Sequence, residues 1–178
     1  MEPFKVTGSR RIHQGRVINL RVDTLDVGDG RTVDREIIEH PGAIVVAALD
    51  DRGRVLMVRQ YRHAAGESLL ELPAGTIEPG ESPAATAARE LQEETGFRAQ
   101  ELMLAGGYYS APGFCTEFLH LFIARQLAPH RLPGDSDEDI TVEPVELSTT
   151  RHLILSGQIK DAKTIAGLHV LELTLTGS

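Results

Sequence analysis

Three glutamates fall within one short predicted helix in the stretch GTIEPGESPAATAARELQEETGF, residues 75–97. Glu90 and Glu94 are four residues apart and Glu90 and Glu93 are three apart, so all three carboxylates reach one side of a helix. Like charges at this spacing destabilise a helix, and these also stand near its negative C-terminal end. We therefore expect a positive species beside them. Oxygen ligands that leave room for water and phosphate suit Mg²⁺, or Mn²⁺, far better than Zn²⁺.

A solvated acidic face is the alternative interpretation, because most Glu-Glu pairs on helices have that origin. The spacing of the whole stretch decides between the two. The pattern is Gly75, five residues, Glu81, seven residues, Arg89-Glu90, an apolar residue, one residue, Glu93-Glu94, one residue, a glycine and an apolar residue. This resembles the Nudix box at every defined position. Nine restricted positions over 23 residues are far more specific than a lone glycine motif.

The resemblance implies a hydrolase that cleaves a nucleoside diphosphate linked to another group, with magnesium as the metal. Four metal ligands are implied: Glu90, Glu93, Glu94 and the carbonyl oxygen of Ala74, just before the box. By the same resemblance Glu93 and Glu94 take part in catalysis, while Arg89 and Glu81 orient the site. The chemistry is consistent, because a metal bridging a pyrophosphate neutralises its charge and positions or deprotonates the attacking water.

Outside the box, the chain resembles the ADP-ribose pyrophosphatase branch of this family. Pro112 follows Gly96 by sixteen residues, and Arg62 ends a Gln-x-Arg sequence at the end of a predicted strand. In this branch such an arginine grips the substrate pyrophosphate, a contact that suits the paired donors of a guanidinium. The alternatives are an ordinary Pro-Gly turn and a surface arginine beside a strand end.

The same branch supplies further substrate contacts. Glu117, five residues after Pro112, matches an acidic residue that accepts hydrogen bonds from the terminal ribose hydroxyls. Arg59, beside the Gln-x-Arg sequence, and Gly113, beside the proline, are also placed in substrate binding. The alternative for Glu117 is an exposed residue at the start of a strand.

The acidic segment 133–142 precedes a predicted strand, and related enzymes draw a catalytic glutamate from such a loop. We predict that Glu138 activates the water, with Asp139 and Glu143 as alternatives. Loop movement would bring the carboxylate in once substrate and metal are bound. A solvated acidic loop without a catalytic part is the other interpretation.

The predicted function is magnesium-dependent hydrolysis of ADP-ribose, or a related nucleoside diphosphate sugar, with AMP and ribose 5-phosphate as the products from ADP-ribose. GDP-mannose or another nucleotide sugar is an alternative substrate. The box indicates binding of a metal and a pyrophosphate, but it does not indicate which base or sugar the substrate carries. A non-catalytic ADP-ribose-binding module is a further alternative. The full carboxylate set and the lack of a basic helix-turn-helix segment disfavour it.

Composition limits the class of protein. The 178 residues, 41% of them apolar, suffice for one main core and a small extra element. A net charge of −8 argues against a nucleic-acid surface. We expect no membrane segment, since the chain lacks both a signal-type N-terminus and a run of about 18 apolar residues. The single cysteine, Cys115, fits a reducing compartment, so a cytoplasmic location is expected.

The first 40 residues read as short antiparallel strands around a turn at residues 28–30, with a boundary at Pro41-Gly42. So small a sheet needs a partner face. We predict a β-rich dimerisation element at residues 1–40 and the Nudix hydrolase domain at residues 41–178. The resemblance implies a homodimer in which the N-terminal strands lend residues to the neighbouring site.

The remaining pattern alternates strands and helices, which indicates an α/β protein. The predicted strands are 43–49, 54–60, 69–72, 101–109, 117–124 and 142–147, and the first two form a hairpin. The box helix should run about 13 residues from Pro83, capped by Ser82 and ended by Gly96. Helices are also expected at 148–156, capped by Ser148 or Thr149, and at 161–173, with Asp161 near the start. The family supplies the specific fold, an α/β/α sandwich with a mixed sheet.

Overall fold

The computed structural model describes residues 4–134 and 139–177. They form two compact units, each described here by itself. The first combines the chain up to Gly42 with Tyr109–Phe118, and the second combines Ala43–Tyr108 with the chain from Leu119 onward. Segment 109–118 joins the N-terminal unit through backbone hydrogen bonds. Ile38 N–H donates to the Phe114 carbonyl over 2.7 Å, and Thr116 N–H donates to the Ile38 carbonyl over 2.9 Å.

The first unit is built on an antiparallel sheet in the order β1-β2-β3. The strands are β1 (Lys5–Gln14), β2 (Asn19–Gly28) and β3 (Arg31–Glu39). Gly28, Asp29 and Gly30 all have positive φ, which explains why this tight turn is rich in glycine. Every residue of β1 is exposed to solvent. The predicted N-terminal antiparallel sheet is therefore confirmed, and its outermost strand lacks cover within the described chain.

The second unit contains a mixed sheet in the order β10-β5-β4-β9-β8, with β6 paired to β5 and β7 paired to β4. Strand β4 runs parallel to β9 and antiparallel to β5, which confirms the mixed sheet. The strands are β4 (Ala43–Leu49), β5 (Arg54–Arg62), β6 (Glu67–Glu71), β7 (Ala74–Thr76), β8 (Phe97–Tyr109), β9 (Phe118–Pro129) and β10 (Ile140–Glu146).

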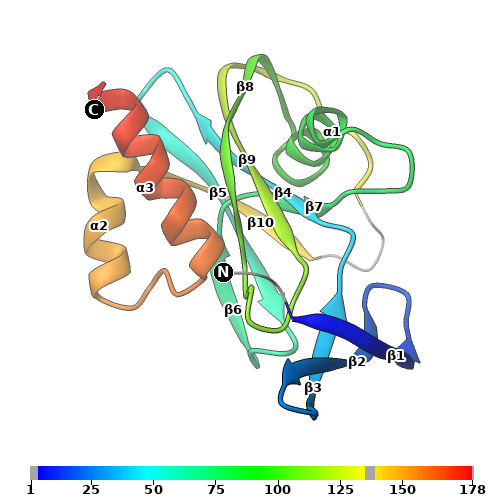
Figure 1. Cartoon of the computed structure of the whole chain (residues 1–178). Helices are drawn as coiled ribbons and strands as arrows, with labels where there is room; N and C mark the ends of the chain where they lie inside the picture. Colours follow the sequence, from blue (N-terminus) through cyan, green and yellow to red (C-terminus); the bar gives the residue numbers. More distant parts are fainter. Residues whose placement is uncertain (1–3, 135–138, 178) are drawn as a thin grey trace. The chain divides into compact units, whose positions relative to one another are not determined.

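Helices cover both faces of this sheet (Figure 1). They are α1 (Pro83–Thr95), α2 (Leu147–Leu155) and α3 (Ala162–Thr176). Strand β4 is buried on both sides, as its apolar run predicted. Ile44 and Val46 belong to the core cluster that contains Leu91 of α1, whereas Val45 belongs to the cluster that contains Leu168 of α3. The alternation of strand side chains thus builds two cores and confirms the α/β/α sandwich.

The box helix has the predicted limits. Ser82 Oγ accepts a hydrogen bond from Ala85 N–H over 3.2 Å, and Pro83 is the first helical residue. Gly96 ends the 13-residue helix with φ of 77°. A proline that needs no amide partner and a glycine that tolerates the left-handed region fix the two ends. The position of α1, and therefore of its carboxylates, follows from local sequence.

The predicted cap of α2 is wrong. Its N-cap is Glu146, and no side chain caps the helix. Thr149 Oγ1 instead donates to the carbonyl of Glu146 over 2.8 Å. The helix begins directly where β10 ends, so Ser148 and Thr149 already lie inside its first turn. The predicted role of Asp161 is confirmed, since its carboxylate accepts from Thr164 N–H over 2.9 Å at the start of α3.

Within the described ranges, the model contains no helix with the length and apolarity required to cross a bilayer.

Candidate active site

Arg89 gathers three carboxylates around one guanidinium. Its Nε and Nη2 each donate to Glu81 over 3.0 Å, and its Nη1 donates to both Glu90 and Glu93 over 2.8 Å. Glu81 precedes α1, while the other two glutamates lie on the helix. The positive species that the sequence requires beside the acidic helix is therefore, in this structure, a side chain of the helix itself. The role of Arg89 in orienting the site, which the resemblance implies, stays a prediction.

The charges around Arg89 shift the ionisation of the groups that it binds. Hydrogen bonds from Arg89 and from the Thr86 hydroxyl lower the pKa of Glu81 to about 2. The same carboxylates raise the pKa of Arg89 above its ordinary value, the bond to Glu81 being the main cause. All of these contacts favour the ionised forms. Arg89 therefore stabilises Glu81 as an anion.

Gly75 allows the backbone to lie directly against Glu90. A Cβ atom built at Gly75 would stand 2.0 Å from Glu90 Oε1, closer than any real contact. Every residue other than glycine would push the Glu90 carboxylate away or move the backbone. The first glycine of the box is thus explained by close approach rather than by an unusual φ.

Glu94 contacts the residue just before Gly75. It is 5% exposed, and its carboxylate accepts a hydrogen bond from Ala74 N–H over 3.1 Å. Ala74 begins β7, which is held in place by pairing with β4. The structure therefore brings the residue before the box glycine next to the last acidic residue of the box, although the two are twenty positions apart.

The donor set fits a divalent metal in its chemistry. Carboxylate oxygens from Glu90, Glu93 and Glu94 are hard ligands of the kind that Mg²⁺ and Mn²⁺ prefer. As the side chains stand, no three His, Cys, Asp or Glu residues within 4–134 and 139–177 are arranged around a single metal position. Arg89 Nη1 contacts Glu90 and Glu93 at once, so a metal would compete with that contact.

Arg62, at the end of β5, lies within electrostatic reach of this acidic helix. Glu94 is among the negative charges that raise the pKa of Arg62, although a hydrogen-bonded pair with Glu71 is the main cause. The guanidinium donates to Glu71 through Nε and Nη2, each over 2.8 Å. Arg62 is therefore fixed by Glu71, which lies three residues before the Ala74 that contacts Glu94.

Arg59 and Glu143 form a pair across β5 and β10. Arg59 Nε donates to Glu143 over 2.5 Å and Nη2 donates over 3.0 Å. These hydrogen bonds lower the pKa of Glu143 and raise that of Arg59. A carboxylate that is stabilised as an anion is a weaker base, so this pairing argues against Glu143 as the residue that activates water. Arg59 would have to leave Glu143 to contact a substrate.

Two of the predicted substrate residues, Glu117 and Gly113, lie in the first unit. Glu117 stands with one carboxylate oxygen 3.6 Å from Nδ1 of His40. Pro112 and Gly113 belong to the turn before it, and a Cβ atom at Gly113 would meet nothing within 4 Å. Their roles in substrate binding stay predictions.

Glu138 lies outside the described residues, while its neighbour Asp139 is exposed. Gly134 and Ile140, described residues of this segment, each lie near another element of the second unit. A Cβ atom at Gly134 would stand 3.8 Å from the carbonyl oxygen of Glu93. At the other end, Ile140 pairs with Gln60 of β5. Gly134 therefore lies near the last turn of α1, and Ile140 lies beside the strand that carries Arg62.

Sequence reasoning missed Glu71, which pairs with Arg62, and Lys163, which binds the same Glu71 carboxylate. Glu71 is 1% exposed and lies in the apolar run LLELPAG. A glutamate at a buried strand position is a signal in itself, because an ionised side chain is placed there only with a partner. Lys163 carries no such signal, since its contact depends on how α3 packs against β6.

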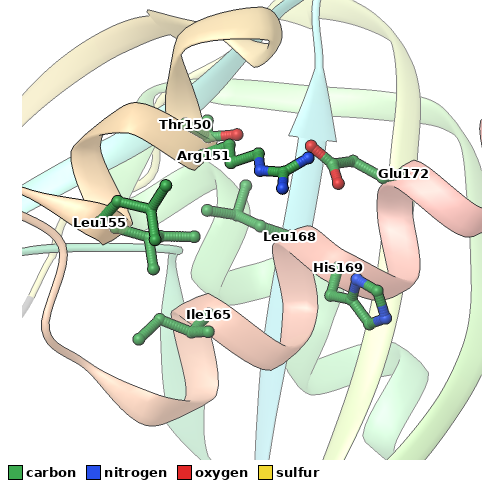
Figure 2. A pocket seen from close by; sticks show the side chains of 8 residues that line it. Thr150, Arg151, Leu155, Ile165, Leu168, His169 and Glu172 are labelled. Atoms are coloured by element: carbon green, nitrogen blue, oxygen red, sulfur yellow. The ribbon is translucent and has the colours of Figure 1, made fainter.

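A cavity of about 390 Å³ lies between α2 and α3 (Figure 2). It is lined by Thr150, Arg151, Ile154, Leu155, Ile165, Leu168, His169 and Glu172. These helices cover the sheet face opposite α1, as the two separate cores show. The cavity is thus separated by the sheet from the carboxylates of the box.

Comparisons with known proteins agree with this geometry. The family model described as the NUDIX domain matches residues 39–166. The ADP-ribose pyrophosphatase of Bacillus subtilis is 39% identical over 171 residues, which cover 95% of this chain and 92% of the relative. A protein of Bacillus methanolicus named methanol dehydrogenase activator is 37% identical, with the same coverage of both chains.

A solved structure shares the fold. The crystal structure of an ADP compounds hydrolase superposes with a TM-score of 0.89 and covers 99% of this chain and 96% of its own. Its sequence identity is 22%, so the likeness concerns the fold alone.

The lowered pKa of Glu81 predicts how the free energy of unfolding changes in acid. Because its pKa is about 2 when folded and 4.5 ordinarily, the unfolded chain binds a proton first as the pH falls. This contribution to the free energy of unfolding is complete above pH 4.5 and is lost as the pH falls toward 2. In urea titrations, Glu81→Gln should flatten the decline of that free energy between these limits. An identical pH dependence in both proteins would contradict the role of Arg89 at Glu81.

Proposed function

Because the chain belongs to the Nudix family, we propose that it hydrolyses the pyrophosphate bond of ADP-ribose or of a related nucleoside diphosphate sugar. ADP-ribose would give AMP and ribose 5-phosphate. One observation carries the proposal: Glu71, which binds Arg62, lies three residues before Ala74, whose N–H binds Glu94, so one short stretch of chain connects a cation to a metal-type carboxylate. This arrangement suits a diphosphate, which needs both a metal and a guanidinium. The name of the Bacillus subtilis relative supports ADP-ribose as the substrate.

The residues proposed to hold Mg²⁺, or Mn²⁺, are Glu90, Glu93, Glu94 and the carbonyl oxygen of Ala74. When bound, the metal would neutralise pyrophosphate charge and lower the barrier to attack by water. The chain's own contribution is to hold Glu90 and Glu93 together through Arg89, to hold Glu94 through Ala74 N–H, and to bring the backbone at Gly75 against Glu90. A site assembled before the substrate binds loses less free energy in ordering itself.

The other roles are proposed from the positions of the residues along the chain. Arg62 would contact the pyrophosphate, and Glu138 would position or deprotonate the attacking water. Glu117 would accept hydrogen bonds from the distal sugar, with Arg59 and Gly113 as further substrate contacts. The described ends of the acidic segment support Glu138, since they lie next to Glu93 and Gln60.

A substrate panel tests the function. Purified protein with Mg²⁺ should release AMP from ADP-ribose faster than it cleaves GDP-mannose, NADH or an oxidised nucleoside triphosphate. Glu93→Gln should lower kcat by about two orders of magnitude or more, because it removes charge where the metal is held. Glu101→Gln, on β8, is the control and should keep normal turnover. A circular dichroism spectrum equal to that of the unsubstituted protein would show that the fold is intact.

Each rival function has its own outcome in that panel. Preferential cleavage of GDP-mannose would show that GDP-mannose is the substrate, while the reaction would still be hydrolysis of a pyrophosphate bond. Tight binding of ADP-ribose without turnover in Mg²⁺ or Mn²⁺ would show a binding module instead. Full activity of Glu93→Gln would refute the assignment of the metal ligands.

The first unit supports a proposal about assembly. We infer that β1 forms part of a homodimer interface, because this ten-residue strand is exposed along its whole length. Phe4, Val6 and Ile12 are each about half exposed. An uncovered strand with apolar side chains is a strong site for association. The cytoplasmic location expected from the single cysteine stays a prediction.

Sedimentation equilibrium tests the dimer. The wild-type chain should sediment at twice the mass of 19.4 kDa, and Val6→Lys with Ile12→Lys should shift the protein toward the monomer. Leu155→Lys is the matched control, since Leu155 is a highly exposed apolar residue of α2. A wild-type monomer at micromolar concentration would contradict the proposal.

A further inference from the structure

Glu71 is a buried carboxylate that binds two cations. It lies at the end of β6 and is 1% exposed. Arg62 Nη2 and Lys163 Nζ both donate to the same oxygen, Oε2, while Arg62 Nε donates to Oε1. Lys163 also contacts the Asp161 carboxylate over 3.0 Å. The cluster joins β5, β6 and the start of α3.

The ionised form of Glu71 is maintained by these partners. Burial alone would raise its pKa, yet Arg62 and Lys163 together hold it below its ordinary value. Taking a carboxylate out of water is costly unless its lone pairs are satisfied with good geometry, and here both oxygens have cationic donors. A purely structural ion pair would also keep Glu71 ionised. A role in ligand binding requires, in addition, that one edge of the Arg62 guanidinium can reach a ligand.

Arg62 is fixed along one edge only. Its Nε and Nη2 bind Glu71, while Nη1 has no partner among residues 4–134 and 139–177, and the side chain is 37% exposed. A guanidinium has donors on more than one edge, so one can bind a carboxylate while another faces a phosphate. An arginine held in this way loses less conformational entropy when the ligand binds.

Lys163 shares the charge of Glu71 with Arg62. A lone Glu71 would neutralise the guanidinium, whereas a second cation on the same carboxylate takes part of that negative charge. Asp161 lies 3.0 Å from Lys163, and the same Asp161 oxygen accepts from Thr164 N–H over 2.9 Å and from the Thr164 hydroxyl over 2.6 Å at the start of α3. Carboxylates are stabilised at that end of a helix. Glu71 therefore neutralises Arg62 only in part.

The start of α3 is fastened to the strand that carries Glu71. Leu72 N–H donates to the Thr164 hydroxyl over 2.8 Å, and Tyr108 donates from its hydroxyl to the Lys163 carbonyl over 2.7 Å. A Cβ atom at Gly167 would stand 2.6 Å from Leu72, so the helix lies very close to this segment. Lys163 is consequently held in place by packed secondary structure, as a precise binding site requires.

We propose that Glu71, supported by Lys163, is a positioning residue that orients Arg62 toward the diphosphate of the substrate. The proposal rests on the proposed function, because it takes Arg62 as the diphosphate contact. Glu71 acts through Arg62 and does not itself touch the substrate. Its removal should therefore have an effect only while Arg62 is present.

A double-mutant cycle tests this dependence. Kinetics with ADP-ribose and Mg²⁺, and calorimetric binding of ADP-ribose in EDTA, are measured for Glu71→Gln, Arg62→Ala and the combined variant. Glu71→Gln should raise KM and Kd about tenfold, the value of a charged hydrogen bond, with little change in kcat. In the Arg62→Ala background it should change them less than about twofold. Glu67→Gln is the control, because Glu67 lies on the same strand and pairs with Lys160 in solvent.

Lys163 gives a second cycle should Glu71→Gln not fold. Lys163→Met should raise KM in the presence of Arg62 but not in its absence, and Lys163→Arg should restore most of the affinity. Equal effects of Glu71→Gln or Lys163→Met in both backgrounds would overturn the proposal and leave only a structural role. An unchanged KM in Arg62→Ala would do the same. Wild-type protein that neither binds nor cleaves ADP-ribose would instead refute the proposed function on which the inference rests.

Discussion

The repulsion between carboxylates on α1 is the constraint on which the rest of the structure depends. Three glutamates within one helical turn would destabilise an isolated helix. Arg89 offsets this by donating to Glu81, Glu90 and Glu93 from one guanidinium, and the backbone at Gly75 approaches because no side chain intervenes. The helix is then held against the sheet by its apolar residues, including the buried Leu91. Stability and chemistry share one set of residues, which explains why the box is so restricted in sequence.

The sheet places a cation beside this helix. Strand β5 ends at Arg62, and β6 turns back so that Glu71 binds it. From Glu71 the chain needs only three residues to reach Ala74, whose N–H binds Glu94. A short stretch of backbone therefore connects the guanidinium to the acidic helix. The opposite face contributes as well, because α3 supplies Lys163 to the same carboxylate.

Much of this was predictable where the determinants are local. Ser82, Pro83 and Gly96 fix the ends of α1, and the apolar run at 43–49 identifies the central strand. The shared contact of Glu90 and Glu93 with Arg89 follows from helical spacing. The pairs of Arg62 with Glu71 and of Arg59 with Glu143 were not predictable, because they depend on strand pairing and register between distant segments. The prediction of the α2 cap was wrong for a related reason. The preceding strand runs directly into the helix, so the Thr149 hydroxyl donates to the Glu146 carbonyl and does not accept from a backbone N–H as a cap would.

The central proposal is that Glu90, Glu93 and Glu94 of α1 hold a divalent metal. Titration with Mn²⁺, followed by electron paramagnetic resonance of the free ion, tests it without reference to any substrate. The account predicts saturable binding by the wild-type protein that is strongly weakened in Glu90→Gln and unchanged in Glu101→Gln. Binding that is absent from the wild type, or is equal in all three proteins, would contradict the account.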